Sequence, residues 1–301
     1  MFSFSKKYDP LFLDTKKQDE FDNLGFTSIQ ILDEESILKL TSLFQKYNEN
    51  KGGFFPTTYS QNNIDRKKIS HEIIEIVRPF LEKNIKDYKI FAGSFIAKYP
   101  DKKSELGIHQ DMTLLDESKF IGVNIWIPLC EINNKNGAVY ILPKSNRLIP
   151  SYRNASIPNI YDLHSDLIKK YTKPVFLKEG EALIFDHSII HFSPPNFSND
   201  IRIAVNVFIS DKDARIRTCH LDAKNKNGKI LIYEHQDNFI EEYEQFDNQN
   251  DKLPKIGKLI EETDYLFESI GPELLKQNYG ELAPKNLINR IFDKIRKKIN
   301  G

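Results

Sequence analysis

The sequence predicts an α+β fold, mainly β, in which a jelly-roll core (a double-stranded, cupin-like β-helix) is flanked by N-terminal helices and followed by a C-terminal helical appendage. Three observations support this prediction. Helical periodicity is confined to the first 84 residues and to the C-terminal end, short apolar runs recur from residue 88 to 209, and turn-forming segments separate those runs. Such spacing is typical of antiparallel sheets rather than of alternating strands and helices.

One strand and two helices are predicted in the N-terminal part. Residues 25–32 alternate like a strand, and Asp33 stands where a helix N-cap would. The apolar periodicity then predicts a helix over 34–47 and a second one over about 66–84. Pro79 should kink the second helix or start a new turn.

The middle of the chain is predicted to form the jelly roll. Seven strand-like runs lie at 88–99, 121–128, 138–142, 174–178, 181–186, 189–192 and 201–209. Segments rich in Asn, Gly, Glu and Pro separate several of these runs and suit the reversal of an antiparallel chain.

We expect a core unit at residues 1–211 and a C-terminal extension at 212–301 that packs on it. The extension is rich in loop-forming residues, and two helical patterns close it at about 258–270 and 284–299. The last pattern is basic and amphipathic. Docking on the barrel is its default interpretation, and a homo-oligomer contact or attachment to a membrane surface are the alternatives.

Composition argues against several classes of protein. Lys+Arg and Asp+Glu both number 43, so a surplus of cations for nucleic acid is missing. The two cysteines, Cys130 and Cys219, do not suggest the disulfide framework of a secreted domain, and a cytoplasmic location is expected. No window approaches the roughly 18 apolar residues of a membrane span, so no transmembrane segment is expected.

Three residues have the pattern of a metal site. His109 and Asp111 are two residues apart, which on a strand places both side chains on one face. His191 interrupts a later apolar strand, as expected of a ligand from across a barrel. Two histidines and one carboxylate cover one face of an octahedral Fe(II) and leave room for a bidentate 2-oxo acid and O₂, whereas zinc prefers four ligands. The pattern therefore predicts Fe(II).

Arg202 is the predicted binding residue for the co-substrate 2-oxoglutarate. It opens an apolar strand after His191, where a buried cation is costly unless it has an anionic partner. Its guanidinium suits the distal carboxylate of a 2-oxo acid. A structural carboxylate would be the alternative partner.

His187 is the main competitor for a ligand role, because it precedes His191 by four residues. The run from Asp186 to Ser188 is typical of a bend between two strands, so we interpret His187 as a non-ligand. The remaining histidines are interpreted as structural or solvent-exposed: His71, His164, His220 and His235.

Four stretches carry a family resemblance. They are His109 to Asp111, Trp126 to Leu129, Asn136 to Arg147, and Gly180 to Phe185 continuing through His191 to Arg202. With these stretches the chain resembles the phytanoyl-CoA dioxygenase-like branch of the Fe(II)/2-oxoglutarate-dependent oxygenases over about residues 25–210. Lys144 and Asn146 replace the glycine and histidine of the family's usual PGSH block, which leaves the shape of that loop open.

The resemblance implies a dioxygenase that hydroxylates a small-molecule substrate and releases succinate and CO₂. It further implies that Ser193 and Trp126 contact 2-oxoglutarate. Ser193 lies on the same strand face as His191, whereas Trp126 could equally be barrel filling. Related halogenases replace the metal-binding carboxylate with a small residue, so the presence of Asp111 favours hydroxylation. Desaturation, cyclisation and epimerisation stay open.

Two other functions stay in view. One is a cupin-like metal enzyme that does not use 2-oxoglutarate, and the other is a non-catalytic binding or scaffold protein on the same fold. Arg202 separates the 2-oxoglutarate-dependent enzyme from the cupin-like one, because binding of 2-oxoglutarate requires succinate to form in step with substrate oxidation. The intact triad together with Arg202 argues against the scaffold. The segments expected to face the substrate, 52–60, 101–105, 148–161 and the region after 211, suggest an anionic or hydroxylated small metabolite.

Overall fold

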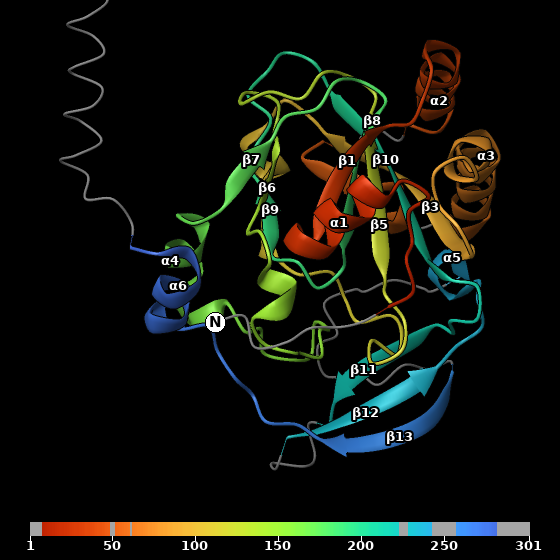
Figure 1. Ribbon diagram of the computed structural model, residues 1–301. Coiled ribbons are helices and arrows are strands. Elements are labelled where there is room, and N and C mark those ends of the chain that lie inside the picture. The colour runs from red at the N-terminus through yellow and green to blue at the C-terminus, as the bar shows by residue number, and fades with distance from the viewer. Residues whose placement is uncertain (1–7, 49–51, 61, 223–227, 243–256, 282–301) are drawn as a thin grey trace, which may run out of the picture.

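The computed structural model describes residues 8–48, 52–60, 62–222, 228–242 and 257–281. Two antiparallel sheets face each other as a jelly roll, and a third sheet lies beyond one end of it (Figure 1). The predicted fold class, mainly β with flanking helices, is thereby confirmed. None of the described helices has the length and apolar character needed to span a bilayer.

The larger sheet has six strands, and every neighbouring pair is antiparallel. In spatial order they are β1 (Phe26–Gln30), β8 (Glu181–Asp186), β5 (Val123–Pro128), β10 (Arg202–Asp211), β3 (Tyr88–Lys98) and β2 (Phe54–Pro56). Strand alternation divides its residues between two faces. On β5, Ile125 and Ile127 pack toward the helices, whereas Asn124 and Trp126 line the interior of the jelly roll.

The smaller sheet supplies the opposite wall. Its strands are, in spatial order, β4 (Leu106–His109), β9 (His191–Ser193), β6 (Val139–Ile141) and β7 (Lys173–Val175). Ile141 from this sheet belongs to the same buried apolar cluster as Trp126 and Leu183 of the larger one, so the two sheets share this part of the core.

Two helices cover the outer face of the larger sheet: α2 (Glu34–Tyr47) and α3 (Asn63–Leu81) (Figure 1). The predicted limits of α2 are confirmed, and the Asp33 side chain caps it by accepting a hydrogen bond from the Ser36 amide. Leu40 of α2 and Ile73 of α3 are fully buried in the same core cluster as Phe95 of β3. The burial of these apolar stripes holds both helices on the sheet.

A further helix, α1 (Thr15–Leu24), lies in a segment whose pattern does not predict it. Phe21 is its one buried residue, so it has no apolar stripe to reveal it. Its ends carry the signal instead, because Asp14 accepts from the Lys16 amide and Gly25 adopts the left-handed conformation of a C-cap.

The C-terminal extension contains a three-stranded antiparallel sheet of β11 (Arg217–Leu221), β12 (Lys229–Glu234) and β13 (Lys258–Asp264). The predicted helix over 258–270 is therefore wrong. Its first seven residues form an edge strand beside β12, and all but one of them are exposed, so no apolar pattern marks the strand. The predicted helix at 284–299, with its oligomer and membrane alternatives, lies outside the described residues.

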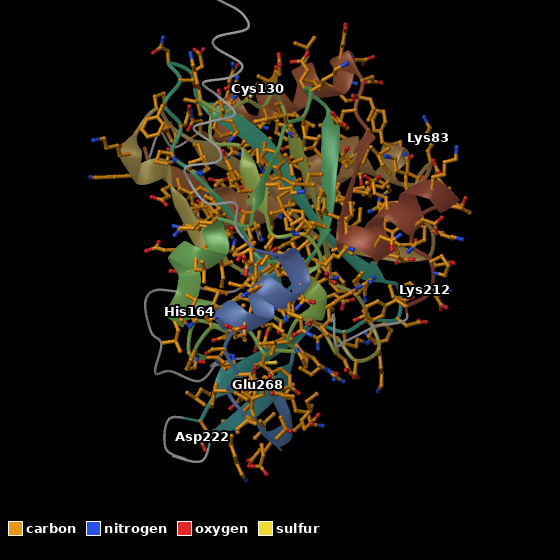
Figure 2. All side chains as sticks on the ribbon, turned by 60° about the vertical axis from the view of Figure 1, so that its left-hand side comes forward. Lys83, Cys130, His164, Lys212, Asp222 and Glu268 are labelled. Atoms are coloured by element: carbon orange, nitrogen blue, oxygen red, sulfur yellow. The ribbon has the colours of Figure 1, made fainter. Side chains whose placement is uncertain are left out.

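The described chain also contains three short α-helices, α4 (Ser165–Lys169), α5 (Phe239–Glu242) and α6 (Pro272–Tyr279), and four single-turn 3-10 helices at Thr57–Tyr59, Lys102–Ser104, Ser145–Arg147 and Asp162–His164. Figure 2 shows Asp222 and Glu268 at the end of the molecule occupied by the three-stranded sheet, with Cys130 at the opposite end. Leu275 of α6 is buried in a cluster with Ile168 of α4, which ties the extension to the core unit.

Candidate metal centre

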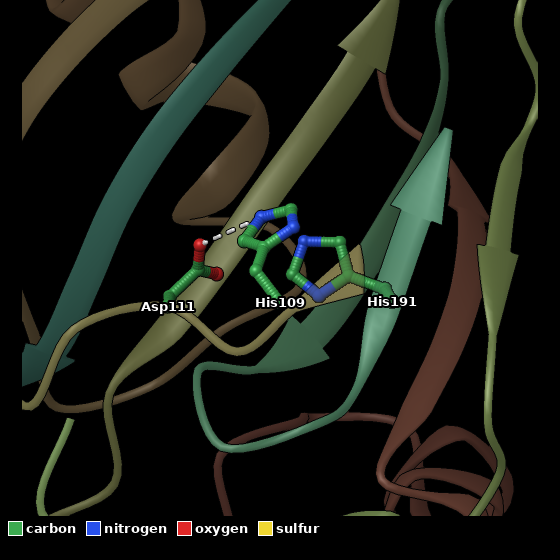
Figure 3. A group of neighbouring side chains, drawn as sticks. All are labelled: His109, Asp111 and His191. Atoms are coloured by element: carbon green, nitrogen blue, oxygen red, sulfur yellow. Dashed lines mark ion pairs between the residues drawn. The ribbon is translucent and has the colours of Figure 1, made fainter. Parts of the chain in front are cut away.

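His109, Asp111 and His191 meet inside the jelly roll, and each offers one ligand atom within 4.8 Å of the others (Figure 3). His109 ends β4 and His191 begins β9, and the two are opposite each other in the strand register. Their ring centroids are 4.1 Å apart, and His109 Nε2 lies 3.7 Å from Asp111 Oδ1. The prediction that one strand carries both His109 and Asp111 is wrong in detail, because β4 ends at His109.

Both histidine rings are oriented by their Nδ1 atoms. Nδ1 of His109 lies 2.8 Å from the Gly107 carbonyl oxygen, and Nδ1 of His191 lies 3.0 Å from that of Ile189. A proton on each Nδ1 would be donated to these carbonyl groups, which leaves the Nε2 lone pairs free to bind a metal.

The electrostatics keep His109 and Asp111 in their ligating states. Burial, followed by the proximity of His191, lowers the pKa of His109 to about 4, so its imidazole is neutral at pH 7. Burial acts to raise the pKa of Asp111, but the neighbouring histidines, His191 foremost, outweigh it and the pKa is lowered. Neutral imidazole and ionised carboxylate are the forms that bind metal ions.

Contacts with other segments position Asp111, which lies beyond the strand. Its Oδ2 accepts a hydrogen bond of 2.7 Å from Asn124 Nδ2, and Asn124 Oδ1 accepts one of 3.0 Å from Asn206 Nδ2. The Asp111 carbonyl oxygen accepts from Arg153 Nε at 2.7 Å, and its amide donates to the His187 carbonyl oxygen at 2.9 Å. Carboxylate and backbone are thus both fixed, and Oδ1 is left facing the histidines.

Arg202 is buried at the first residue of β10 and lines the same cavity as the triad. Within the described chain, its Nε and Nη1 atoms are buried without a hydrogen-bond partner. Its guanidinium carbon lies 5.1 Å from the centroid of the Trp126 ring. Burial lowers the pKa of Arg202 to about 10, so the group is still charged at neutral pH. A buried, charged fork with unpartnered N–H groups fits an anionic ligand.

Lys98 stands directly opposite Arg202 in the strand register and is fully buried. Its Nζ lies within hydrogen-bonding distance of three carbonyl oxygens, of Ser104 at 2.6 Å, Ser193 at 2.9 Å and Pro194 at 2.8 Å. Burial, followed by the proximity of Arg202, lowers the pKa of Lys98 to about 6. Because its donors are all engaged, Lys98 fixes the backbone at Ser193 and leaves Arg202 as the anion-binding group.

One cavity of about 590 Å³ contains all of these groups. It is lined by each predicted site residue: His109, Asp111, Trp126, His191, Ser193 and Arg202. Three of the four segments expected to face the substrate also line it, through Phe54 to Thr58, Arg153 to Tyr161, and Phe239 with Ile240. The fourth, 101–105, contributes no lining residue, so that expectation is wrong.

Asn124, Asn206 and Arg153 are site residues that the motifs do not reveal. Asn124 and Asn206 alternate with apolar residues and occupy the inward face of β5 and β10, and a polar side chain at such a position is the signal that could have found them. His187, interpreted as a non-ligand, lines the cavity but does not belong to the triad.

The departures in the PGSH-like block are explained by local geometry. Lys144 has φ +66°, the left-handed conformation that glycine adopts without strain. Asn146 Nδ2 donates to Asp186 Oδ2 at 3.0 Å, which ties this loop to the end of β8. The loop therefore keeps a glycine-type backbone although a lysine occupies it.

A jelly roll that holds two histidines and one carboxylate beside a buried arginine defines a class of protein, the mononuclear metal-dependent oxygenases. The phytanoyl-CoA dioxygenase family model matches residues 35–204, so the chain belongs to that family. A phytanoyl-CoA dioxygenase domain-containing protein 1 homolog from Dictyostelium discoideum is 29% identical over 129 residues. That match covers 40% of this chain and 45% of the relative, less than half its length.

Solved structures of similar arrangement have low identity. The carbocyclase SnoK from nogalamycin biosynthesis is 16% identical and covers 68% of this chain and 86% of its own, with a TM-score of 0.49. EvdO2 from Micromonospora carbonacea var. aurantiaca, complexed with 2-oxoglutarate, is 19% identical, and the match covers 66% of this chain and 91% of EvdO2 with a TM-score of 0.48. EctD from S. alaskensis is 16% identical, and the match covers 68% of this chain and 78% of EctD with a TM-score of 0.49. These values are too low to transfer a substrate.

Proposed function

We propose that the protein is an Fe(II)- and 2-oxoglutarate-dependent dioxygenase that hydroxylates a small-molecule metabolite and releases succinate and CO₂. The observation that carries the proposal is the pairing, in one cavity, of the His109, Asp111 and His191 triad with the unpartnered guanidinium of Arg202. Membership of the phytanoyl-CoA dioxygenase family supports it.

The residues fit both groups. His109 Nε2, His191 Nε2 and Asp111 Oδ1 would hold Fe(II), since their other polar atoms are occupied by neighbouring groups. Arg202 would bind the distal carboxylate of 2-oxoglutarate, and Ser193, which lines the same cavity, would add a hydroxyl donor. When bound, the pair supplies an O₂-derived oxidant, as 2-oxoglutarate is decarboxylated to succinate and one oxygen atom is delivered to the substrate.

The other residues of the site hold the ligands in place, orient the co-substrate and exclude water. Trp126 packs against the guanidinium of Arg202 and limits its access to water. Asn124 and Arg153 keep Asp111 in place from two directions. No side chain needs to act as a general acid or base, because the oxidation derives its chemistry from the cofactor pair.

The test is succinate formation from 2-oxoglutarate in the presence of Fe(II), O₂ and a panel of candidate metabolites. We expect at least one compound to stimulate succinate release in a one-to-one ratio with oxidised product, and His109→Ala to abolish both. Turnover of a substrate without 2-oxoglutarate would instead support the cupin-like enzyme. Failure to bind Fe(II) at all would support the scaffold.

A further inference from the structure

The charged groups of the cavity define which substrates it can accept. Among the described residues that line it, Asp111, Arg153 and Arg202 carry a formal charge at neutral pH. His109 is directed by its Nδ1 contact with Gly107 to offer Nε2 to the metal, and the His187 ring packs on Phe208 with its Nε2 buried and without a hydrogen-bond partner among the described residues, so neither ring presents a charge to a substrate. The proposed function assigns Asp111 to iron and Arg202 to 2-oxoglutarate. Arg153 is then the one described charge left to face a substrate.

Arg153 is already occupied. Its Nη1 donates to Glu117 Oε2 at 3.0 Å and to the Ser151 carbonyl oxygen at 2.9 Å, and its Nη2 contacts the other Glu117 oxygen. Its Nε donates to the Asp111 carbonyl oxygen at 2.7 Å. Glu117 therefore cancels the charge of Arg153, and four of the five N–H groups of its guanidinium have partners. An anionic substrate would have to compete with this partly buried, bidentate carboxylate.

The bound cofactor pair leaves no net charge either. The two positive charges of Fe(II) and the one of Arg202 balance Asp111 and the two carboxylates of 2-oxoglutarate. Because a charge without a partner is costly in a buried site, an ion that entered beside this balanced centre would lose its hydration without compensation.

The rest of the wall is uncharged and of two kinds. An apolar part is formed by Leu114, Phe208, Phe239 and Ile240, together with Phe54, Pro56 and Met112. An uncharged polar part is formed by Thr58, Asn154, Asn159 and Tyr161. A wall of this composition suits a molecule with an apolar body and hydroxyl, carbonyl or amide groups.

We propose that the substrate, in the part that enters this cavity, is an uncharged amphipathic molecule, an inference that rests on the proposed function. Of the two substrate types expected from the lysines, arginines and tyrosines of the flanking segments, anionic or hydroxylated, the proposal keeps the hydroxylated one. No lysine lines the cavity among the described residues, and the Arg153 charge is neutralised by Glu117.

The test is an anaerobic calorimetric titration of the Fe(II)·2-oxoglutarate complex with probes that share one body and differ in charge. Three such probes are 2-phenylethanol, phenylacetate and phenylethylammonium, and the titration is repeated with the corresponding naphthyl series. We expect a neutral probe to bind at least about tenfold more tightly than either ion of its series. An ion that binds as tightly as its neutral counterpart, or a panel in which no neutral probe binds, would overturn the proposal.

Two matched variants test the charge argument itself. Ala155 is exposed and lines the cavity, so Ala155→Lys adds a cation without disturbing the core, and Ala155→Gln is its uncharged control. We expect Ala155→Lys to raise the affinity for phenylacetate about fivefold and Ala155→Gln to leave it unchanged. Glu117→Gln should raise it about tenfold by releasing Arg153. Equal phenylacetate binding by wild type and Ala155→Lys would count against a neutral site.

The proposed function and the neutral substrate can be refuted separately. The visible absorption band of 2-oxoglutarate bound to Fe(II) forms before any probe is added, and its absence would refute the proposed function. A normal band together with preferred binding of an ionic probe would refute the neutral substrate alone.

Discussion

Replacement of Asn124 by alanine should weaken Fe(II) binding although Asn124 is not itself a ligand. Its Nδ2 donates to Asp111 Oδ2 at 2.7 Å, which leaves Oδ1 directed toward His109 Nε2 at 3.7 Å. Without this hydrogen bond the carboxylate can rotate. Loss of an outer hydrogen bond of this kind typically costs about 10- to 100-fold in metal affinity, or about 1.4 to 2.8 kcal/mol.

Asn206 provides a graded version of the same test. Its Nδ2 donates to Asn124 Oδ1 at 3.0 Å, one step further from the ligand, so Asn206→Leu should reduce Fe(II) affinity by up to about tenfold. Ser94→Ala, on the neighbouring inward face of β3, is the control and should leave the affinity unchanged.

The assay is anaerobic competition for Fe(II) against a chromogenic chelator. Unfolding in denaturant, measured in parallel, separates metal affinity from stability. If Asn124→Ala bound Fe(II) as tightly as wild type while remaining folded, the positioning role of the Asn206 to Asn124 to Asp111 chain would be refuted.

Three further predictions concern Arg202, Lys144 and the histidine pair of the C-terminal sheet. Arg202→Met should weaken 2-oxoglutarate binding about 100-fold and Arg202→Lys about tenfold in calorimetric titrations, and equal affinities would contradict the assigned role. Lys144→Gly should raise the free energy of unfolding by about 1 kcal/mol, because at φ +66° a lysine is in the left-handed conformation that glycine adopts without strain. The expected increase in Tm is about 2 °C, and no increase would mean that the lysine is unstrained. Burial lowers the pKa values of His220 and His235 to about 4, so the unfolded state, in which both histidines regain their ordinary pKa, binds protons more tightly. The free energy of unfolding should therefore fall between pH 6.5 and pH 4, by up to about 1.4 kcal/mol per pH unit for each histidine. A free energy of unfolding in denaturant that stays constant across this range would contradict this prediction.

The parts of the fold that could be predicted are the elements with one apolar face and one polar face, or with an uninterrupted apolar run. The α2 helix was predictable because Leu40 and its neighbours form an apolar stripe that begins directly after the Asp33 cap. Most strands of the jelly roll were predictable because they alternate or are uniformly apolar, whereas β2 and β4, of three and four residues, lie outside the predicted runs. By contrast, α1 and β13 bury almost nothing, and their structure depends on caps and on a partner strand.

In the candidate site, too, some residues could be predicted from the sequence and others could not. His109, Asp111, His191 and Arg202 were recognisable from residue type and spacing. The groups that orient them were not, because the contact from Asn124 to Asp111 depends on how two segments meet in space rather than on any local pattern. Counting charges along the chain also does not show which of them a substrate meets, because the pairing of Arg153 with Glu117 appears only in the fold.

The measurement that tests the central claim most directly is an anaerobic titration of Fe(II) and 2-oxoglutarate into the metal-free protein, followed by visible absorption. We predict a weak charge-transfer band from the 2-oxo acid bound to ferrous iron, with saturation at one equivalent of each, and loss of the band in His109→Ala. A folded protein that binds Fe(II) but forms no such band with 2-oxoglutarate would contradict the assignment of the triad and Arg202 to this cofactor pair.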